Sequence, residues 1–140
     1  MIGAIVTRLI ALCPSLADVV VAEDAAALDK GTALRSGTAI VIPYRERARP
    51  NTLIAGGHRQ AVETQILVAL LGRLHGDVRG AERAMFFDAC KGEIETALAG
   101  WAPADDAEAF SLIGGEGSAM GNGVSIYVQT WQTVRFLTGA

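Results

Sequence analysis

The segment from Val124 to Leu137 constrains the fold of this chain more than any other part of the sequence. One side of the segment carries aliphatic and aromatic residues, namely Val124, Ile126, Val128, Val134 and Phe136. The other side is polar and aromatic and carries Ser125, Tyr127, Gln129, Trp131, Thr133 and Arg135. This period of two predicts a strand whose aliphatic side packs inward. The tight-turn signal Asn122-Gly123 before it predicts a C-terminal β-hairpin, with 110–113 as the other strand and the glycine-rich stretch 114–123 as the connection.

Two segments have the spacing of amphipathic helices. In the first, apolar residues recur every three or four positions from Ile2 to Ile10, and Pro14 ends the segment. In the second, from Ala81 to Trp101, the same spacing forms one apolar stripe that ends near Gly100. The stripe consists of Phe87, Cys90, Ile94, Ala97, Leu98 and Trp101.

Strand signals lie mostly between these two helices. Val19-Val20-Val21 suits a short strand, 25–30 suits one or two helical turns, and Thr38 to Arg49 reads as a longer strand. Pro43 within it indicates an edge or a bulge, because proline has no N–H for a ladder. The stretch from His58 to Leu74 fits a strand and a helix equally well, and periodicity leaves both open. The order of elements predicts an α+β fold, with two helices on one face of a largely antiparallel sheet.

Length and charge limit the classes of protein to which the chain can belong. Its 140 residues suit one domain, 1–140. A net charge of -3 provides no overall basic field, which argues against sequence-specific or other nucleic-acid binding as the main role. The apolar runs fall short of the roughly 20 residues that cross a bilayer, so no membrane partner is expected. Cys13 and Cys90 have neither zinc-site nor disulfide spacing, and both suit a reducing cytoplasm.

The residue types that usually carry catalysis lack the surroundings that catalysis needs. The glycine-rich stretch precedes a strand and not a helix, which favours a hairpin over a phosphate cradle. Ser118 lacks the flanking glycines of a nucleophile elbow, and His58 and His75 have no ligand at metal spacing. The acids of 105–108 read as a solvated linker. We therefore expect no enzyme activity, no catalytic residues, no metal and no cofactor.

Arg45, Arg47 and Arg49 form the one charged pattern that suggests a function. Their spacing of two places three guanidinium groups on the same side of a strand. One interpretation is that charges on an exposed strand prevent aggregation. The other is that the arginines bind an acidic protein partner through bidentate contacts. The two interpretations are compatible.

The aromatic residues of the last strand are the other candidates for an interface. Trp101 is most simply a core residue, whereas Trp131 suits the core and an interface anchor equally. Tyr127 lies on the same polar, aromatic side of the strand as Trp131. The candidate interface residues are therefore Arg45, Arg47, Arg49, Tyr127 and Trp131.

The order of these features resembles that of the bacteriophage tail terminator, or tail completion, proteins, especially the branch in transposable phages and prophages. The shared features are the N-terminal helix, the arginine-bearing segment, the apolar stretch 62–71, the polar break 76–80, a long helix ending Ala-Leu-Ala-Gly-Trp-Ala-Pro at 97–103, and a terminal hairpin with Trp131 and Phe136. The resemblance covers essentially the whole chain, and the helix ending is its most specific part.

The resemblance implies a fold in which 62–74 is a strand, and it implies a structural role. Proteins of this family are expected to form a hexameric ring that caps the head-proximal end of the tail tube in the virion. There they end tube polymerisation and provide the surface for a head-side connector protein, after assembly in the host cytoplasm. The implied partners are further copies of the chain, the tail tube protein and the connector. A different head-tail joining adaptor or minor tail protein, or a small cytosolic ligand-binding domain or enzyme, remains an alternative.

Overall fold

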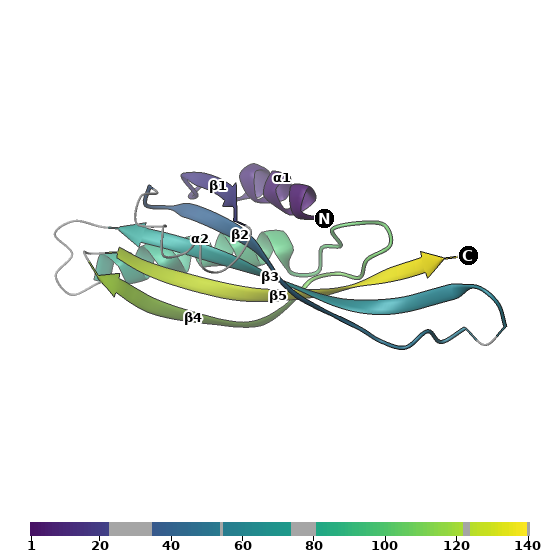
Figure 1. The fold of residues 1–140 in the computed structure, drawn as a ribbon. Coiled ribbons are helices and arrows are strands. Elements are labelled where there is room, and N and C mark those ends of the chain that lie inside the picture. Colours follow the sequence, from purple (N-terminus) through teal and green to yellow (C-terminus); the bar gives the residue numbers. More distant parts are fainter. Residues whose placement is uncertain (23–34, 54, 74–80, 122–123, 140) are drawn as a thin grey trace.

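The computed structural model describes residues 1–22, 35–53, 55–73, 81–121 and 124–139, and it has two helices and five strands (Figure 1). The helices are α1 (Ile2–Leu12) and α2 (Ala81–Leu98). The strands are β1 (Asp18–Val21), β2 (Thr38–Ala48), β3 (His58–Arg73), β4 (Ser111–Gly121) and β5 (Val124–Gly139). The predicted turns at 25–30, the polar break at 76–80 and the Asn122-Gly123 turn lie wholly or mainly outside the described residues.

The five strands form one mixed sheet in the order β1-β2-β3-β5-β4. The short β1 pairs parallel to β2, and the other three pairings are antiparallel. The stretch from His58 that periodicity left open is therefore a strand, as the family resemblance implied. The longest pairing joins β3 to β5 from His58↔Gly139 to Arg73↔Val124.

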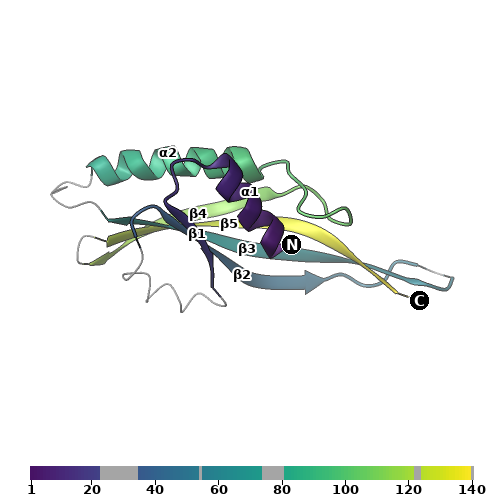
Figure 2. The same ribbon diagram turned by 90° about the horizontal axis from the view of Figure 1, so that it is seen from above.

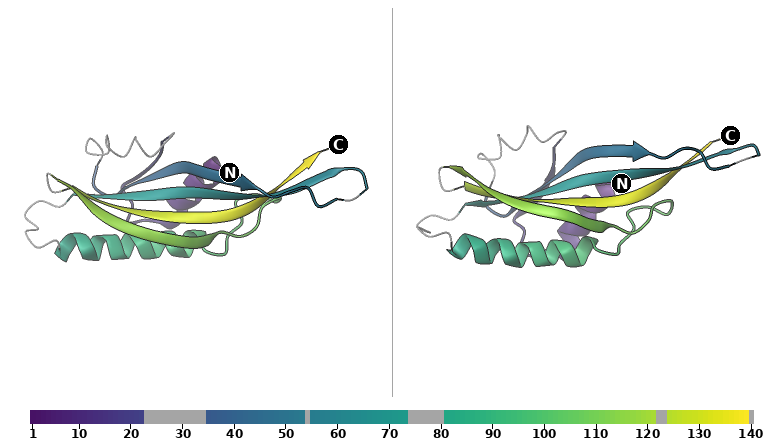
Figure 3. Two further views of the ribbon diagram at one scale, coloured as in Figure 1. Left: turned by 60° about the horizontal axis from the view of Figure 1, so that its bottom comes forward. Right: turned by 90° about the horizontal axis from the view of Figure 1, so that it is seen from below.

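Both helices pack on one face of the sheet, which we call the helix face (Figures 2 and 3). The main core on this face joins Ile5 and Leu9 of α1 and Ile94 of α2 to Ile66 of β3 and Trp131 of β5. Apolar residues three or four positions apart bring one stripe of each helix onto the sheet. The helix signals of the sequence are thus confirmed, with α2 ending at Leu98 before Gly100, whose φ is +76°.

The opposite face of the sheet also buries apolar side chains. Its cluster consists of Ile40, Ile42, Leu67, Ala69 and Ile126. The aliphatic side of β5 therefore lies on this opposite face, and its polar, aromatic side lies under the helices. The sequence correctly separated the two sides of β5. Both sides are partly buried, however, because Ile126 of the aliphatic side lies in the second cluster and Trp131 of the polar, aromatic side lies in the main core beneath the helices.

The glycine-rich stretch is part of strand β4, and this corrects the expectation that it forms the connection of the hairpin. β4 pairs with β5 from Ser111↔Gln132 to Gly121↔Val124, with irregularities after Leu112 and Ala119. Gly115 and Gly117 lie beneath the ring of Tyr127, and a Cβ on Gly115 would stand 2.4 Å from the Tyr127 hydroxyl oxygen. The glycines therefore leave room for an aromatic ring on the sheet.

One end of the sheet extends beyond the helices as a narrow arm (Figure 1). We define the arm as 45–48 of β2, 58–65 of β3 and 132–139 of β5, all antiparallel. A loop, 49–57, joins β2 to β3 at its tip, where Asn51 Oδ1 accepts hydrogen bonds from the backbone N–H groups of Leu53 and Arg59, at 3.2 and 2.9 Å. Within the described part of the chain, neither helix has the length and hydrophobicity to cross a membrane.

Gly72 tests the packing of α2 on the sheet. A Cβ at this position would lie 2.7 Å from Cζ of Phe87, so we expect Gly72→Ala to lower the free energy of unfolding by about 1–3 kcal/mol through overpacking. Chemical denaturation measures the change. Gly92→Ala is the control, because its Cβ would meet no atom within 4 Å, and it should be neutral or stabilise the fold by up to about 1 kcal/mol. Equal effects of the two substitutions would contradict the observed packing.

Candidate interaction surface

Arg45, Arg47 and Arg49 lie on one face of the arm, and we call them the arginine strip. Arg45 pairs with Gln65 and Arg47 pairs with Glu63, both on the face opposite the helices. The backbone N–H of Arg49 donates to the Ala61 carbonyl at 2.8 Å and continues the same alternation. The prediction that the three guanidinium groups share one side of a strand is confirmed.

A bulge in β2 decides which face the arginines occupy. Ala39, Val41 and Pro43 pair with even-numbered residues of β3 and face the helices. Between Pro43 and Arg45 the register shifts by one residue, so the later odd-numbered residues point to the opposite face. Pro43 also lies beyond the residues of β2 that pair with β1. Both readings of Pro43 are therefore confirmed, because it lies at an edge and directly before a bulge.

Only some of the guanidinium N–H groups of the strip have a hydrogen-bond partner among the described residues. Arg49 forms an ion pair with Glu63, and the Arg45 Nε donates to Gln65 Oε1 at 2.9 Å. The hydrogen bond from Arg49 lowers the pKa of Glu63 below its ordinary value, so this carboxylate stays charged near neutral pH. Arg47 has no hydrogen bond or ion pair among the described residues. A cleft of about 180 Å³ is lined by Arg45, Arg47, Glu63, Gln65 and Gln132.

Tyr44, the extra residue of the bulge, joins the arginine strip to an apolar groove. Its side chain is 51% exposed, and the Arg45 guanidinium lies 5.3 Å from the centre of its ring. The groove, about 460 Å³, runs from Tyr44 past Leu67 and Val128 to Ile113, which is 53% exposed. Sequence reasoning missed Tyr44 as a surface residue; the proline before it was the available signal.

The helix face of the arm has a separate charged network. Glu46 accepts hydrogen bonds from Arg135 Nε at 2.7 Å and from the Thr64 hydroxyl at 2.8 Å. The hydrogen bond from Arg135 is the main cause that lowers the pKa of Glu46. This network pairs β2 with β5 across β3, so it stiffens the arm at a position that the helices do not cover.

Tyr127 and Trp131 lie away from the arginine strip. Trp131 is fully buried, and its indole Nε1 donates to Gln129 Oε1 at 3.2 Å. Tyr127 is half-buried on the helix face, with its ring centre 6.4 Å from that of Phe87. Of the two roles that the sequence left open for Trp131, the structure assigns it to the core. The surface that we consider further keeps the arginine strip and adds Tyr44.

The remaining candidates for chemistry lie apart from one another. Ser118 is exposed on β4, and His58 contacts Gln60, with Nε2 and Oε1 2.6 Å apart. His75 lies outside the described residues. Among those described, no group of three or more His, Cys, Asp or Glu side chains could hold a metal ion. Burial raises the pKa of Cys13 and Cys90 to about 11, which keeps both thiols protonated.

The loop between α2 and β4 is docked on the sheet and is not a free linker. The backbone N–H of Glu108 donates to the Val134 carbonyl at 2.7 Å, and that of Phe136 donates to the Asp106 carbonyl at 3.1 Å. Asp105, Asp106 and Glu108 themselves are exposed, as expected for solvated acids. They lie beside the part of β5 that follows Gln132, with which β4 does not pair.

An exposed tyrosine, neighbouring arginines and an apolar groove on a rigid sheet are typical of a protein–protein interface. Comparison with protein families adds an identity to this class. The model of the family described as phage tail terminator protein matches residues 2–139. The chain belongs to this family, and it is therefore a structural protein of phage tail assembly and a component of the virion. No curated protein matches the chain.

The different burial of Trp131 and Tyr44 gives a test of their roles. Trp131→Ala removes a fully buried indole and should lower the free energy of unfolding by about 3–5 kcal/mol. Tyr44→Ala removes a half-exposed ring and should change it by no more than about 0.5 kcal/mol. Urea denaturation followed by circular dichroism measures both. A small loss for Trp131→Ala would contradict the core assignment.

The raised pKa values of the two cysteines predict low reactivity of the folded chain. With a pKa of about 11, roughly one thiol in a thousand is ionised at pH 8. Both are also buried, so a colorimetric thiol reagent should label neither in the native protein and both in denaturant. Rapid labelling of either cysteine in the native protein would contradict its burial.

Proposed function

We propose that residues 1–140 act as one tail-terminator domain that caps the head-proximal end of the tail tube. In this role the chain forms a hexameric ring, ends addition of tube subunits and provides the surface to which the head-side connector attaches. The family match over residues 2–139 supports the proposal. The match supports a structural role in tail assembly, and capping and head attachment are our proposal beyond it.

The shape of the molecule suits such a role. A closed ring requires each subunit to present two different surfaces that complement each other, and a cap requires two further faces for two partners. The chain presents a helix-covered face, an opposite face with the groove at Tyr44, and an arm that extends past the helices. Among the described strands, β4 is also an edge with one paired neighbour.

The observation that carries the proposal is the uncovered surface formed by Tyr44 and the arginine strip. Apolar and tyrosine side chains supply contact area at a protein interface, and arginines supply directed hydrogen bonds. In this chain both lie side by side on a sheet that the Glu46–Arg135 pair stiffens. A rigid surface loses little conformational entropy on binding, which favours a contact that must form at one defined place.

Removal of the gene from the phage that encodes it tests the role directly. Without a terminator, tube subunits continue to add, so electron microscopy of the lysate should show overlong tails without attached heads. A copy of the gene supplied in trans should restore the normal length. Tails of normal length with heads attached, in the absence of the protein, would contradict the proposed function.

Arg45→Glu combined with Arg47→Glu tests the surface. Both side chains are exposed, so the fold should persist, whereas capping should be lost because two attractive charges become repulsive. Complementation of the deletion measures tail length, and circular dichroism checks folding. The single variants Arg47→Glu and Arg35→Glu each replace one exposed arginine by glutamate, and only the first should reduce complementation. Because Arg35 donates to the Ala17 carbonyl at 3.2 Å, circular dichroism checks that this control is folded as well. Normal tails from the double variant would show that the arginines serve only solvation.

A further inference from the structure

The acidic loop defined by Asp105, Asp106 and Glu108 has the charge that the arginine strip would bind. We propose that the arginine strip of one copy of this chain contacts the acidic loop of a neighbouring copy. This inference rests on the proposed function in one respect, namely that the protein works as an assembly of copies. Beyond the proposed function, it names the two surfaces through which neighbouring copies contact each other.

The acidic loop is a fixed surface whose charges act weakly on two arginines of the same chain, because Asp106 is a minor cause of the raised pKa of Arg135 and Glu108 of that of Arg49. Residues 101–110 contain three acids and no lysine or arginine. The segment is held at both ends, because the Phe110 N–H donates to the Trp101 carbonyl at 2.9 Å and the Gly100 N–H donates to the Phe110 carbonyl at 3.0 Å. The Thr133 hydroxyl also donates to the Glu108 carbonyl. Among the described residues, none of the three carboxylates forms an ion pair.

The arginine strip has donors left to bind such a loop. Each guanidinium carries five N–H groups, and Arg45 uses its Nε for Gln65 while Arg49 is paired with Glu63. Arg47 makes no hydrogen bond or ion pair with the described part of the chain. Arg59 adds a fourth guanidinium near the tip of the arm, where it lies 4.2 Å from the ring centre of Phe136. The strip can therefore bind two carboxylates in bidentate fashion without breaking its internal contacts.

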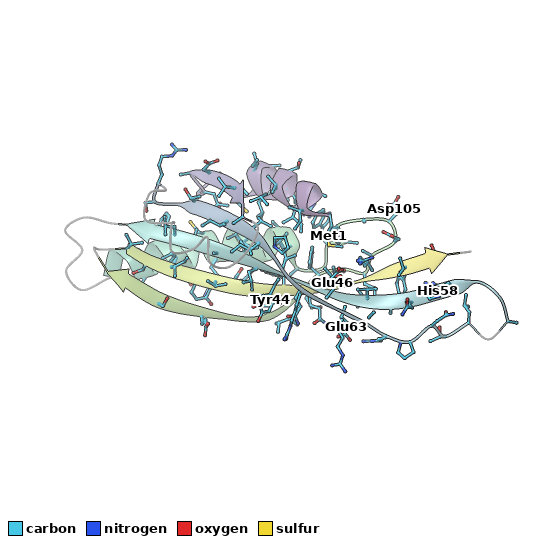
Figure 4. All side chains as sticks on the ribbon, viewed as in Figure 1. Met1, Tyr44, Glu46, His58, Glu63 and Asp105 are labelled. Atoms are coloured by element: carbon cyan, nitrogen blue, oxygen red, sulfur yellow. The ribbon has the colours of Figure 1, made fainter. Side chains whose placement is uncertain are left out.

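The two surfaces point away from each other within one chain. In Figure 4, Asp105 lies on the helix side of the arm and Glu63 lies on the other side with the arginine strip. The charge of Glu108 is a minor cause of the raised pKa of Arg49, after the hydrogen bond and charge of Glu63, and no hydrogen bond joins Arg49 to the loop. Among the described residues, no hydrogen bond or ion pair joins the acidic loop to Arg45 or Arg47 in the same molecule, and the loop reaches the strip only through the weak effect of Glu108 on Arg49.

Opposite charge on opposite sides of one plate leads to head-to-tail association. The positive side of one arm faces the negative side of the next, and the contact leaves a free positive and a free negative side for further copies. Such a contact can repeat from copy to copy, and it closes into a ring when the rotation between successive copies permits closure. The apolar groove at Tyr44 lies next to the strip and would add buried area to the same contact.

Charge reversal with compensation tests the proposal on the purified chain. The strip variant is Arg45→Glu with Arg47→Glu, and the loop variant is Asp105→Arg with Asp106→Arg. Sedimentation velocity at low salt and at protein concentrations up to about 1 mM detects contacts with millimolar or tighter dissociation constants. Each variant alone should associate about tenfold or more weakly than the unaltered chain, because like charges then face each other. An equimolar mixture of the two variants, and the chain with all four changes, should regain association.

A matched control separates the loop from a general effect of charge. Asp18→Arg with Asp88→Arg changes the net charge by the same amount at two exposed acids away from the arm, and it should leave association unchanged. Because Asp18 accepts a hydrogen bond from the Val19 N–H and Asp88 pairs with Lys91, circular dichroism must show that this control is folded. An unaltered chain that stays monomeric at about 1 mM would overturn the proposal. So would failure of the four-fold variant to regain association, since the strip would then bind a different partner such as the tube protein.

The outcome is independent of the outcome for the proposed function. If gene removal gives overlong tails but the four-fold variant does not regain association, the capping role stands and the proposed contact between copies is rejected. Rescue by compensation together with normal tails after gene removal would retain the self-contact and reject the cap.

Discussion

The antiparallel pairing of β3 with β5 is the constraint on which the rest of the structure depends. Both strands have 16 residues, and one end of the pair lies in the core while the other forms the arm. The core end sets the register, because Ile66 must lie beside Trp131 beneath the helices. A slip by one residue would turn the whole ladder over, so burial in the core also determines which side chains each face of the arm presents.

Aromatic packing on the helix face accounts for two glycines of β4, Gly115 and Gly117, and for Gly72 of β3. The rings of Phe87 and Tyr127 lie between α2 and the sheet, and they need space that a Cβ would fill. Gly72, Gly115 and Gly117 supply this space at the positions under the rings. Glycine normally weakens a strand, and here its cost is offset by the packing of two half-buried aromatic side chains. The glycine-rich stretch thus has a packing role that its composition alone does not reveal.

The arm differs chemically from the core because no helix covers it. Many of its side chains are therefore charged or polar, and several of them pair across strands, as Glu46 does with Arg135 and Arg49 does with Glu63. Exposed ion pairs add little to stability, so their effect lies mainly in orienting side chains on a stiff surface. The bulge at Tyr44 turns the arginine strip to the face away from the helices and the acidic loop. An arm of this kind suits the proposed role, in which the chain joins other proteins.

Local pattern was enough for most of the elements. The stripes of α1 and α2, the triplet in β1, the strand after Thr38 and the alternation of β5 follow from spacing alone, because helix and strand periods differ. The common face of Arg45, Arg47 and Arg49 follows from the same rule. Tertiary structure decided that β3 is a strand, since its apolar run fits both periods, and that the polar, aromatic side of β5 lies under the helices. Only the fold could assign Trp131 to the core and expose Tyr44, because burial depends on which element lies above a residue and sequence spacing does not contain that information.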